Sequence, residues 1–139
     1  MKKVKLSPND WLVRLDVGDE IVASLVKFAS EENVISASFS GLGAVGGLKY
    51  GYFNINDREY KVAEESISLE IVNLTGNLAR IDGEPIVHAH ISVGFPDMSV
   101  RGGHLVEGII SITGEIFIRT YDADIYRAEE ELFGLKLIK

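Results

Sequence analysis

The sequence contains no cysteine, and this absence removes several kinds of function at once. Disulfide bonds, thiolate metal ligands and cysteine nucleophiles are all excluded. Any site for a transition metal must therefore be built from histidine and carboxylate side chains. Histidine is itself scarce, because the chain has only three.

Basic residues are also in short supply. The chain has 14 lysine and arginine residues against 21 aspartate and glutamate residues, which gives a formal net charge of −7. Proteins that bind the DNA backbone do so by displacing its counterions with lysine and arginine. This charge balance therefore disfavours direct DNA binding, although it is compatible with a local basic patch.

Long apolar runs are absent as well. No stretch approaches the ~18–20 apolar residues that a membrane-spanning helix needs. The basic start, Met1 to Lys5, is not followed by the apolar segment of a signal peptide. We therefore expect a soluble cytoplasmic protein with no membrane partner. A chain of 139 residues, 46% of them hydrophobic, suits one domain over residues 1–139 with a sizeable core.

The hydrophobic pattern predicts one principal helix among many strands. Asp16 is a suitable N-cap, and apolar residues then repeat at helical spacing until about Asn33. Asp82-Gly83 is a strong hairpin signal. Further segments predict strands at 11–15, 35–40, 48–53, 60–62, 67–75, 86–95, 103–119 and 135–138, and a short helix at 123–133. The expected fold is α+β, a mostly antiparallel sheet or barrel-like domain with one principal helix.

The three histidines fall in one predicted hairpin. In the strand 86–95, His88 and His90 point to the same face, opposite to the core face. A turn centred on Asp97 would place His104 across from His90, with Cβ atoms within roughly 5.5 Å. The two glycines before His104 can bulge the strand, so this register is approximate.

Three imidazoles in this arrangement can bind one divalent transition metal ion. Zinc is the natural choice, because it accepts three histidine ligands and keeps a fourth position open for water or substrate. Iron, nickel or cobalt would fit nearly as well. The competing interpretation is that His88, His90 and His104 are ordinary polar residues on a solvated face.

Four charged residues are weaker candidates for the same site. Glu70, Glu107 and Glu115 lie in predicted strands, where a carboxylate can support a metal ligand or act as a general base. They can equally be solvated residues of the open face. Arg101 can contact an anion, but a surface arginine is the simpler interpretation.

The segment Gly41-Leu42-Gly43-Ala44-Val45-Gly46 fits the G-x-G-x-x-G pattern of dinucleotide-binding proteins. That fingerprint requires a helix to begin at the glycines. Here another strand pattern follows, so we interpret the glycines as a tight bend with close backbone packing. No dinucleotide cofactor is expected.

Several strings of the sequence together resemble the PPC (plants and prokaryotes conserved) domain over nearly the whole chain. They are Arg14 to Ile21, Gly41 to Val45, Leu69 to Asn77, His88-Ala89-His90, Gly102-Gly103-His104-Leu105 and Thr113-Gly114-Glu115-Ile116. The resemblance implies an α+β domain that assembles as a homotrimer. In plants this domain follows a DNA-binding AT-hook, whose Arg-Gly-Arg-Pro core is absent here.

The fold implied by this resemblance is also similar to that of acetolactate decarboxylases, which hold zinc with a His-x-His pair and a later histidine. By that similarity His88, His90 and His104 are the corresponding ligands, but no substrate-binding arginine or carboxylates can be matched. Two functions stay open. One is a metal-containing binding or assembly module, with DNA association as one option. The other is a small zinc-type metalloenzyme that acts on a carbonyl acid. A closed structural metal between subunits is a third possibility.

Overall fold

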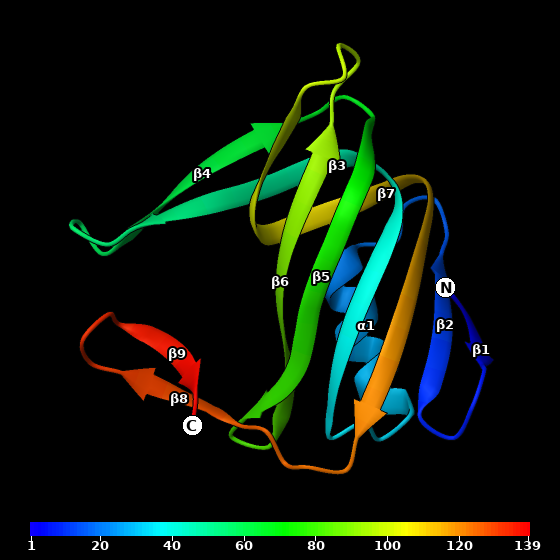
Figure 1. Cartoon of the computed structure of the whole chain (residues 1–139), viewed down its shortest axis with the longest axis vertical. Coiled ribbons are helices and arrows are strands. Elements are labelled where there is room, and N and C mark those ends of the chain that lie inside the picture. The colour runs from blue at the N-terminus through cyan, green and yellow to red at the C-terminus, as the bar shows by residue number, and fades with distance from the viewer.

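The computed structural model describes all 139 residues and consists of ten elements (Figure 1). In chain order they are β1 (Lys2–Lys5), β2 (Asp10–Leu15), α1 (Ile21–Glu31), β3 (Ser36–Asn54), β4 (Glu59–Glu65), β5 (Leu69–Ile81), β6 (Glu84–Gly94), β7 (Val100–Tyr121), β8 (Arg127–Glu130) and β9 (Leu135–Ile138). The predicted α+β fold with a mostly antiparallel sheet and one helix is confirmed. The structure contains no helix with the length and apolar character needed to cross a membrane.

Seven strands form one sheet in the order β1-β2-β7-β6-β5-β3-β4, and every pair is antiparallel. The two longest strands, β3 and β7, also pair with each other. Strands β7, β6, β5 and β3 therefore form a ring, while β1, β2 and β4 extend beyond it. The sheet is partly closed but is not a complete barrel. Strands β8 and β9 form a separate hairpin that projects from the body of the domain (Figure 1).

Helix α1 lies against one face of this sheet and completes the core (Figure 1). Its buried residues are Ile21, Leu25, Phe28 and Ala29, which repeat at helical spacing. Phe28 meets the ring of Trp11 edge to face, with 5.4 Å between the ring centroids. The core contains 23 buried residues from the helix and from alternate positions of the strands. Outward-facing positions of the same strands are left free for a functional site.

The prediction that α1 begins after Asp16 is wrong. The helix begins at Ile21, and Glu20 is the N-cap, with side-chain oxygens that accept from the backbone N–H groups of Val22 and Ala23. Residues 16–19 instead form a turn in which Gly18 has a φ of +87°. That conformation is open to glycine and interrupts a helix.

The glycines at 41–47 do not separate two strands as predicted, because β3 runs through them as one bent strand. The register with β7 shifts at these residues, which bends the strand without ending it. A Cβ at Gly43 would lie 2.0 Å from the carbonyl oxygen of Thr113, so the strands approach too closely for a side chain. No helix begins at these glycines, because β3 continues through them to Asn54.

The predicted helix at 123–133 is also wrong. Strand β8 and a turn occupy this segment, whereas the strand predicted at 135–138 is confirmed as β9. The glutamates at 129–131 favour a helix by intrinsic propensity. Pairing of Arg127–Glu130 with Leu135–Ile138 and a turn closed at Gly134, with a φ of +68°, override that preference. This difference matters for the three histidines, because Arg127 of β8 lies beside His88.

Candidate metal centre

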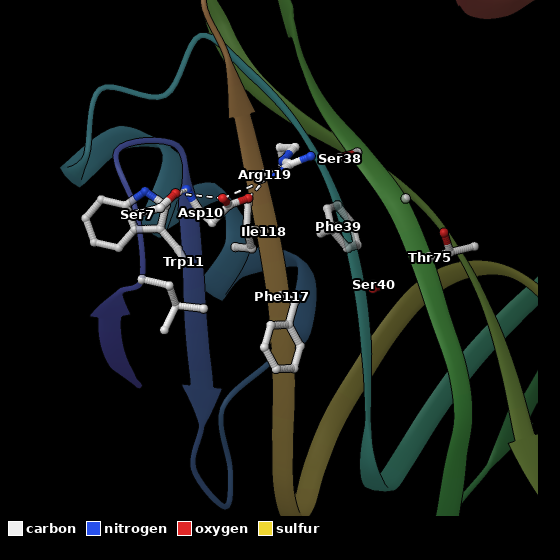
Figure 2. A pocket seen from close by; sticks show the side chains of 12 residues that line it. Ser7, Asp10, Trp11, Ser38, Phe39, Ser40, Thr75, Phe117, Ile118 and Arg119 are labelled. Carbon is white, nitrogen blue, oxygen red and sulfur yellow. Dashed lines mark hydrogen bonds and ion pairs between the residues drawn. The ribbon is translucent and has the colours of Figure 1, made fainter.

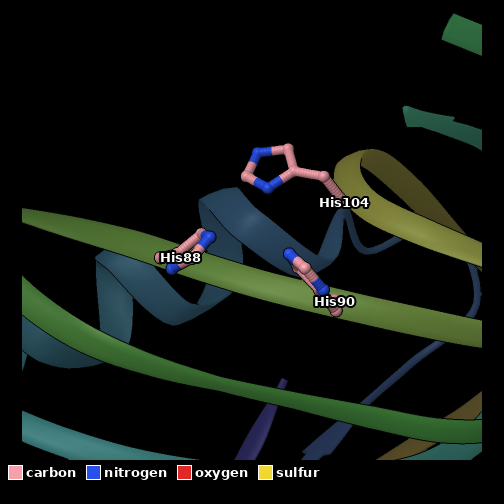
Figure 3. A group of neighbouring side chains, drawn as sticks. All are labelled: His88, His90 and His104. Atoms are coloured by element: carbon pink, nitrogen blue, oxygen red, sulfur yellow. The ribbon is translucent and has the colours of Figure 1, made fainter. Parts of the chain in front are cut away.

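The three histidines converge on one point of the outer sheet face (Figure 3). His88 and His90 lie on β6, and His104 lies on β7 directly opposite His90. One ligand nitrogen from each ring lies within 4.8 Å of the other two. Tetrahedral zinc would bring such nitrogens to about 3.4 Å of one another, so small side-chain rotations would close the site around an ion.

Two glycines place His104 at this point. A Cβ on Gly102 would lie 2.4 Å from the carbonyl oxygen of Ile91 on β6, and one on Gly103 would lie 2.5 Å from that of Gly51 on β3. Strand β7 is therefore packed against both neighbours here. These glycines do not produce a bulge in the β6–β7 pairing, whose register runs without a shift from His90 to Gly94.

The local electrostatics favour neutral imidazoles, which is the form that binds metals. Burial, the positive charge of Arg127 and the other two histidines lower the pKa of His88 from 6.5 to about 4. Burial, with smaller effects of His90 and Arg127, also lowers the pKa of His104. The Nδ1 atom of His104 is buried and has no hydrogen-bond partner. A metal ion bound by this nitrogen would satisfy it, so the donor set fits a transition metal.

Sequence reasoning missed two residues of the site, Arg127 and Asn77. Arg127 reaches across from β8, and its Nη2 lies 2.9 Å from Asn77 Oδ1 and 3.1 Å from His88 Nδ1. Asn77 pairs with His88 across strands β5 and β6. The Asp82-Gly83 hairpin signal could have identified Asn77, because it fixes that register. Nothing in the sequence signalled Arg127.

The weaker sequence candidates do not join the histidines. No carboxylate belongs to the cluster of three histidines. Glu107 pairs with Lys49 at 3.0 Å, while Glu70 and Glu115 are exposed strand residues opposite Gly94 and Arg14. Arg101 is 61% exposed, with an ion pair to Glu65 at 3.5 Å, as expected of a surface arginine.

Two of the histidines open onto a hollow of about 290 Å³, lined by Thr75, Gly76, Asn77, His88, Ala89 and His90. A larger hollow of about 740 Å³ shares Thr75 and Gly76 with it and extends toward β2 (Figure 2). An ion pair between Asp10 and Arg119, at 2.8 Å, lies in the larger hollow. The cluster of three histidines borders the smaller hollow, through His88 and His90.

Several solved structures are similar to this chain over almost its whole length. A candidate DNA-binding protein from Bacteroides thetaiotaomicron is 32% identical, with a TM-score of 0.95, and the match covers 99% of this chain and 96% of the other. A plant- and prokaryote-conserved (PPC) protein from Pyrococcus horikoshii is 34% identical, with a TM-score of 0.88 and coverage of 99% and 93%. A metal-containing protein from Archaeoglobus fulgidus is 32% identical, with a TM-score of 0.89 and coverage of 100% and 99%.

Acetolactate decarboxylase from Bacillus subtilis is a more distant structural neighbour. It is 11% identical, with a TM-score of 0.55, and the match covers 81% of this chain and 53% of the enzyme. This similarity confirms the expected likeness of fold and carries no information about activity. A comparison with curated proteins gave no match.

The sequence also matches a family model directly. The match is to the Plants and Prokaryotes Conserved (PCC) domain, the PPC domain of the resemblance above, and it covers residues 4–122. It includes all three histidines and ends just before the segment that carries Arg127. The chain therefore belongs to the Plants and Prokaryotes Conserved (PCC) domain family.

Proposed function

We propose that this protein binds one divalent transition metal ion, with zinc the best candidate, through His88, His90 and His104. The observation that carries the proposal is the convergence of three imidazole nitrogens within 4.8 Å. The lowered pKa values of His88 and His104 support it, because both rings are available as neutral ligands at neutral pH. The similarity to a metal-containing protein gives independent support.

The function that this site supports best is metal-dependent binding of a small molecule. Three protein ligands leave a fourth position of zinc open, and His88 and His90 border a hollow rather than a closed cavity. A metal there would polarise a carbonyl oxygen or activate water, as in a small metalloenzyme that acts on a carbonyl acid. The chain's own residues would hold the ligand in the hollow.

Metal content is the first measurement. Elemental analysis of the purified protein, before and after incubation with zinc, should give about one equivalent per chain. His88→Ala and His104→Ala should lose that equivalent, and the exposed-site control Arg101→Ala should keep it. A wild-type protein that takes up no zinc would exclude the metal proposal.

We also propose that the protein assembles as a homotrimer, as the PPC resemblance implies. Leu42 and Phe117 are more than half exposed, and their positions in the sheet place both on the face that carries the histidines. Apolar side chains exposed on a polar surface often mark contacts between subunits. Light scattering after size exclusion should give three times the chain mass, and Phe117→Asp should reduce it.

Association with DNA is a second candidate, which the similarity to candidate DNA-binding proteins supports. The net charge of −7 disfavours it, and Arg14, Arg101 and Arg119 are each paired with a carboxylate. Fluorescence anisotropy with a labelled DNA duplex distinguishes the two functions. If the protein binds DNA directly, its affinity should fall by orders of magnitude between roughly 50 and 200 mM salt, because counterions compete for the phosphates. We expect no binding at either salt concentration.

A further inference from the structure

Arg127 is a buried cation without an anionic partner. Arg127 is only 8% exposed, and its Nε atom is buried with no hydrogen-bond partner. The other nitrogens donate to neutral atoms only, namely the carbonyl oxygen of Lys136, Asn77 Oδ1 and His88 Nδ1. None of the chain's ion pairs includes it. A buried charge in this state is strongly unfavourable unless something compensates it.

Metal binding would remove one of these three acceptors. A guanidinium group only donates hydrogen bonds, so His88 Nδ1 must accept the bond from Arg127 Nη2. A metal ion on Nδ1 would take that lone pair. A metal ion on the other ring nitrogen would leave the ring hydrogen on Nδ1, which would then be a donor. In both cases Arg127 needs a new acceptor.

The positive charge around Arg127 indicates that the new acceptor is an anion. A divalent ion and Arg127 together would bring three positive charges into one partly buried region, and no aspartate or glutamate belongs to the cluster. Asn77 holds the guanidinium beside the hollow of about 290 Å³ that His88 and His90 line. A hollow of that size suits a molecule of a few carbon atoms, and a planar guanidinium matches a planar carboxylate.

We propose that the hollow binds a small carboxylate, with its charged group bonded to Arg127 and an oxygen on the open metal position. Arg127 is thus the residue that selects an acidic ligand, and Asn77 positions it. This inference rests on the metal centre proposed above. It concerns a residue that the family match, at residues 4–122, does not include.

The test uses protein loaded with cobalt(II), whose visible spectrum reports changes in its ligands. Pyruvate is the probe, and methyl pyruvate, which is uncharged and of similar shape, is its control. We expect saturable spectral changes with pyruvate and at least tenfold weaker binding of methyl pyruvate. No saturable change with pyruvate, or equal binding of the ester, would overturn the proposal. Tighter binding of inorganic phosphate than of pyruvate would overturn its assignment to a carboxylate.

Two variants connect this binding to Arg127. R127M should keep one equivalent of cobalt but bind pyruvate about tenfold to a hundredfold more weakly, as expected when a hydrogen bond to a charged group is lost. R101M, which alters an exposed arginine, should bind pyruvate like the wild type. If circular dichroism shows that R127M is unfolded, R127Q serves instead, since it loses the charge but keeps a side-chain amide that can still donate hydrogen bonds. Wild-type pyruvate affinity in a folded Arg127 variant would refute the role of Arg127.

The two proposals can fail separately. Wild-type protein that takes up no cobalt or zinc would refute the metal centre and this inference with it. Protein that holds one equivalent of metal but shows no charge-dependent pyruvate binding would refute the carboxylate site alone.

Discussion

The low pKa of His88 makes the stability of the metal-free protein depend on pH in a defined window. The pKa falls from 6.5 in the unfolded chain to about 4 in the folded one. Between these values the unfolded state binds a proton that the folded state excludes. The free energy of unfolding therefore falls as pH is lowered from 6.5 to 4 and is fully recovered above 6.5.

The size of this effect follows from the two pKa values. Linkage gives a loss of about 2 kcal/mol between pH 7 and pH 5 from His88 alone. This is an upper value, because His88 keeps part of its surface in contact with water. Carboxylates whose pKa is lowered on folding, such as Asp10 beside Arg119, add their own loss only toward the acid end of this range, because their unfolded pKa values begin near 4.

The assay is urea denaturation of metal-free protein, with a chelator present, at several pH values between 7.5 and 4.5 and one protein concentration. His88→Asn is the informative variant, because its side-chain oxygen can still accept a hydrogen bond from Arg127 but does not titrate. We expect the wild type to lose about 1–2 kcal/mol more than His88→Asn over this range. Parallel pH profiles for the two proteins would show that burial of neutral His88 does not affect stability.

Three further substitutions test other parts of the structure. Gly103→Ala places a Cβ 2.5 Å from a backbone oxygen of β3, so it should lower the free energy of unfolding by about 1–3 kcal/mol and weaken metal binding. The control Gly47→Ala, whose Cβ would lie 3.6 Å from the nearest atom, should change the free energy of unfolding much less, and equal effects in urea denaturation would contradict this reasoning. Glu20→Ala removes the N-cap of α1 and the carboxylate that accepts a hydrogen bond from the backbone N–H of Gly108 on β7. It should lower the free energy of unfolding by about 1–2 kcal/mol in the same assay, and an unchanged midpoint would show that the cap is dispensable. Phe28→Ala should lower stability by about 3–5 kcal/mol, and a loss below 1 kcal/mol would show that this part of the core repacks.

The geometry of the histidine hairpin could be predicted from sequence because it depends on local rules. Strand alternation placed His88 and His90 on one face, and the turn at Asp97 set His104 opposite His90, as the structure has it. The Asp82-Gly83 turn was predicted for the same reason, and both of its residues have positive φ values. In each case the signal and its consequence lie within a few residues of each other.

The failures come from contacts between distant segments. The sequence around Gly43 predicts a bend between two strands, but in the structure Gly43 packs closely against Thr113 of β7. The continuity of β3 therefore depends on a segment about 70 residues further along the chain. The segment that carries Arg127 has helix-forming glutamates, and only its pairing with β9 fixes it as a strand. Arg127 then reaches Asn77, 50 residues earlier in the chain. No periodicity within either segment encodes such a contact.

The separation of the core from the histidines indicates that the proposed metal centre is not what holds the fold together. The core lies on the α1 side of the sheet, and none of the three histidines belongs to it. The histidine positions are fixed by backbone pairing of β6 with β5 and β7 and of β7 with β3. Zinc fingers, in contrast, are unfolded without their ion because no core holds the ligands in place. Here backbone pairing within the sheet holds the three histidines close together without an ion, so the proposed metal is not needed to keep the strands in place.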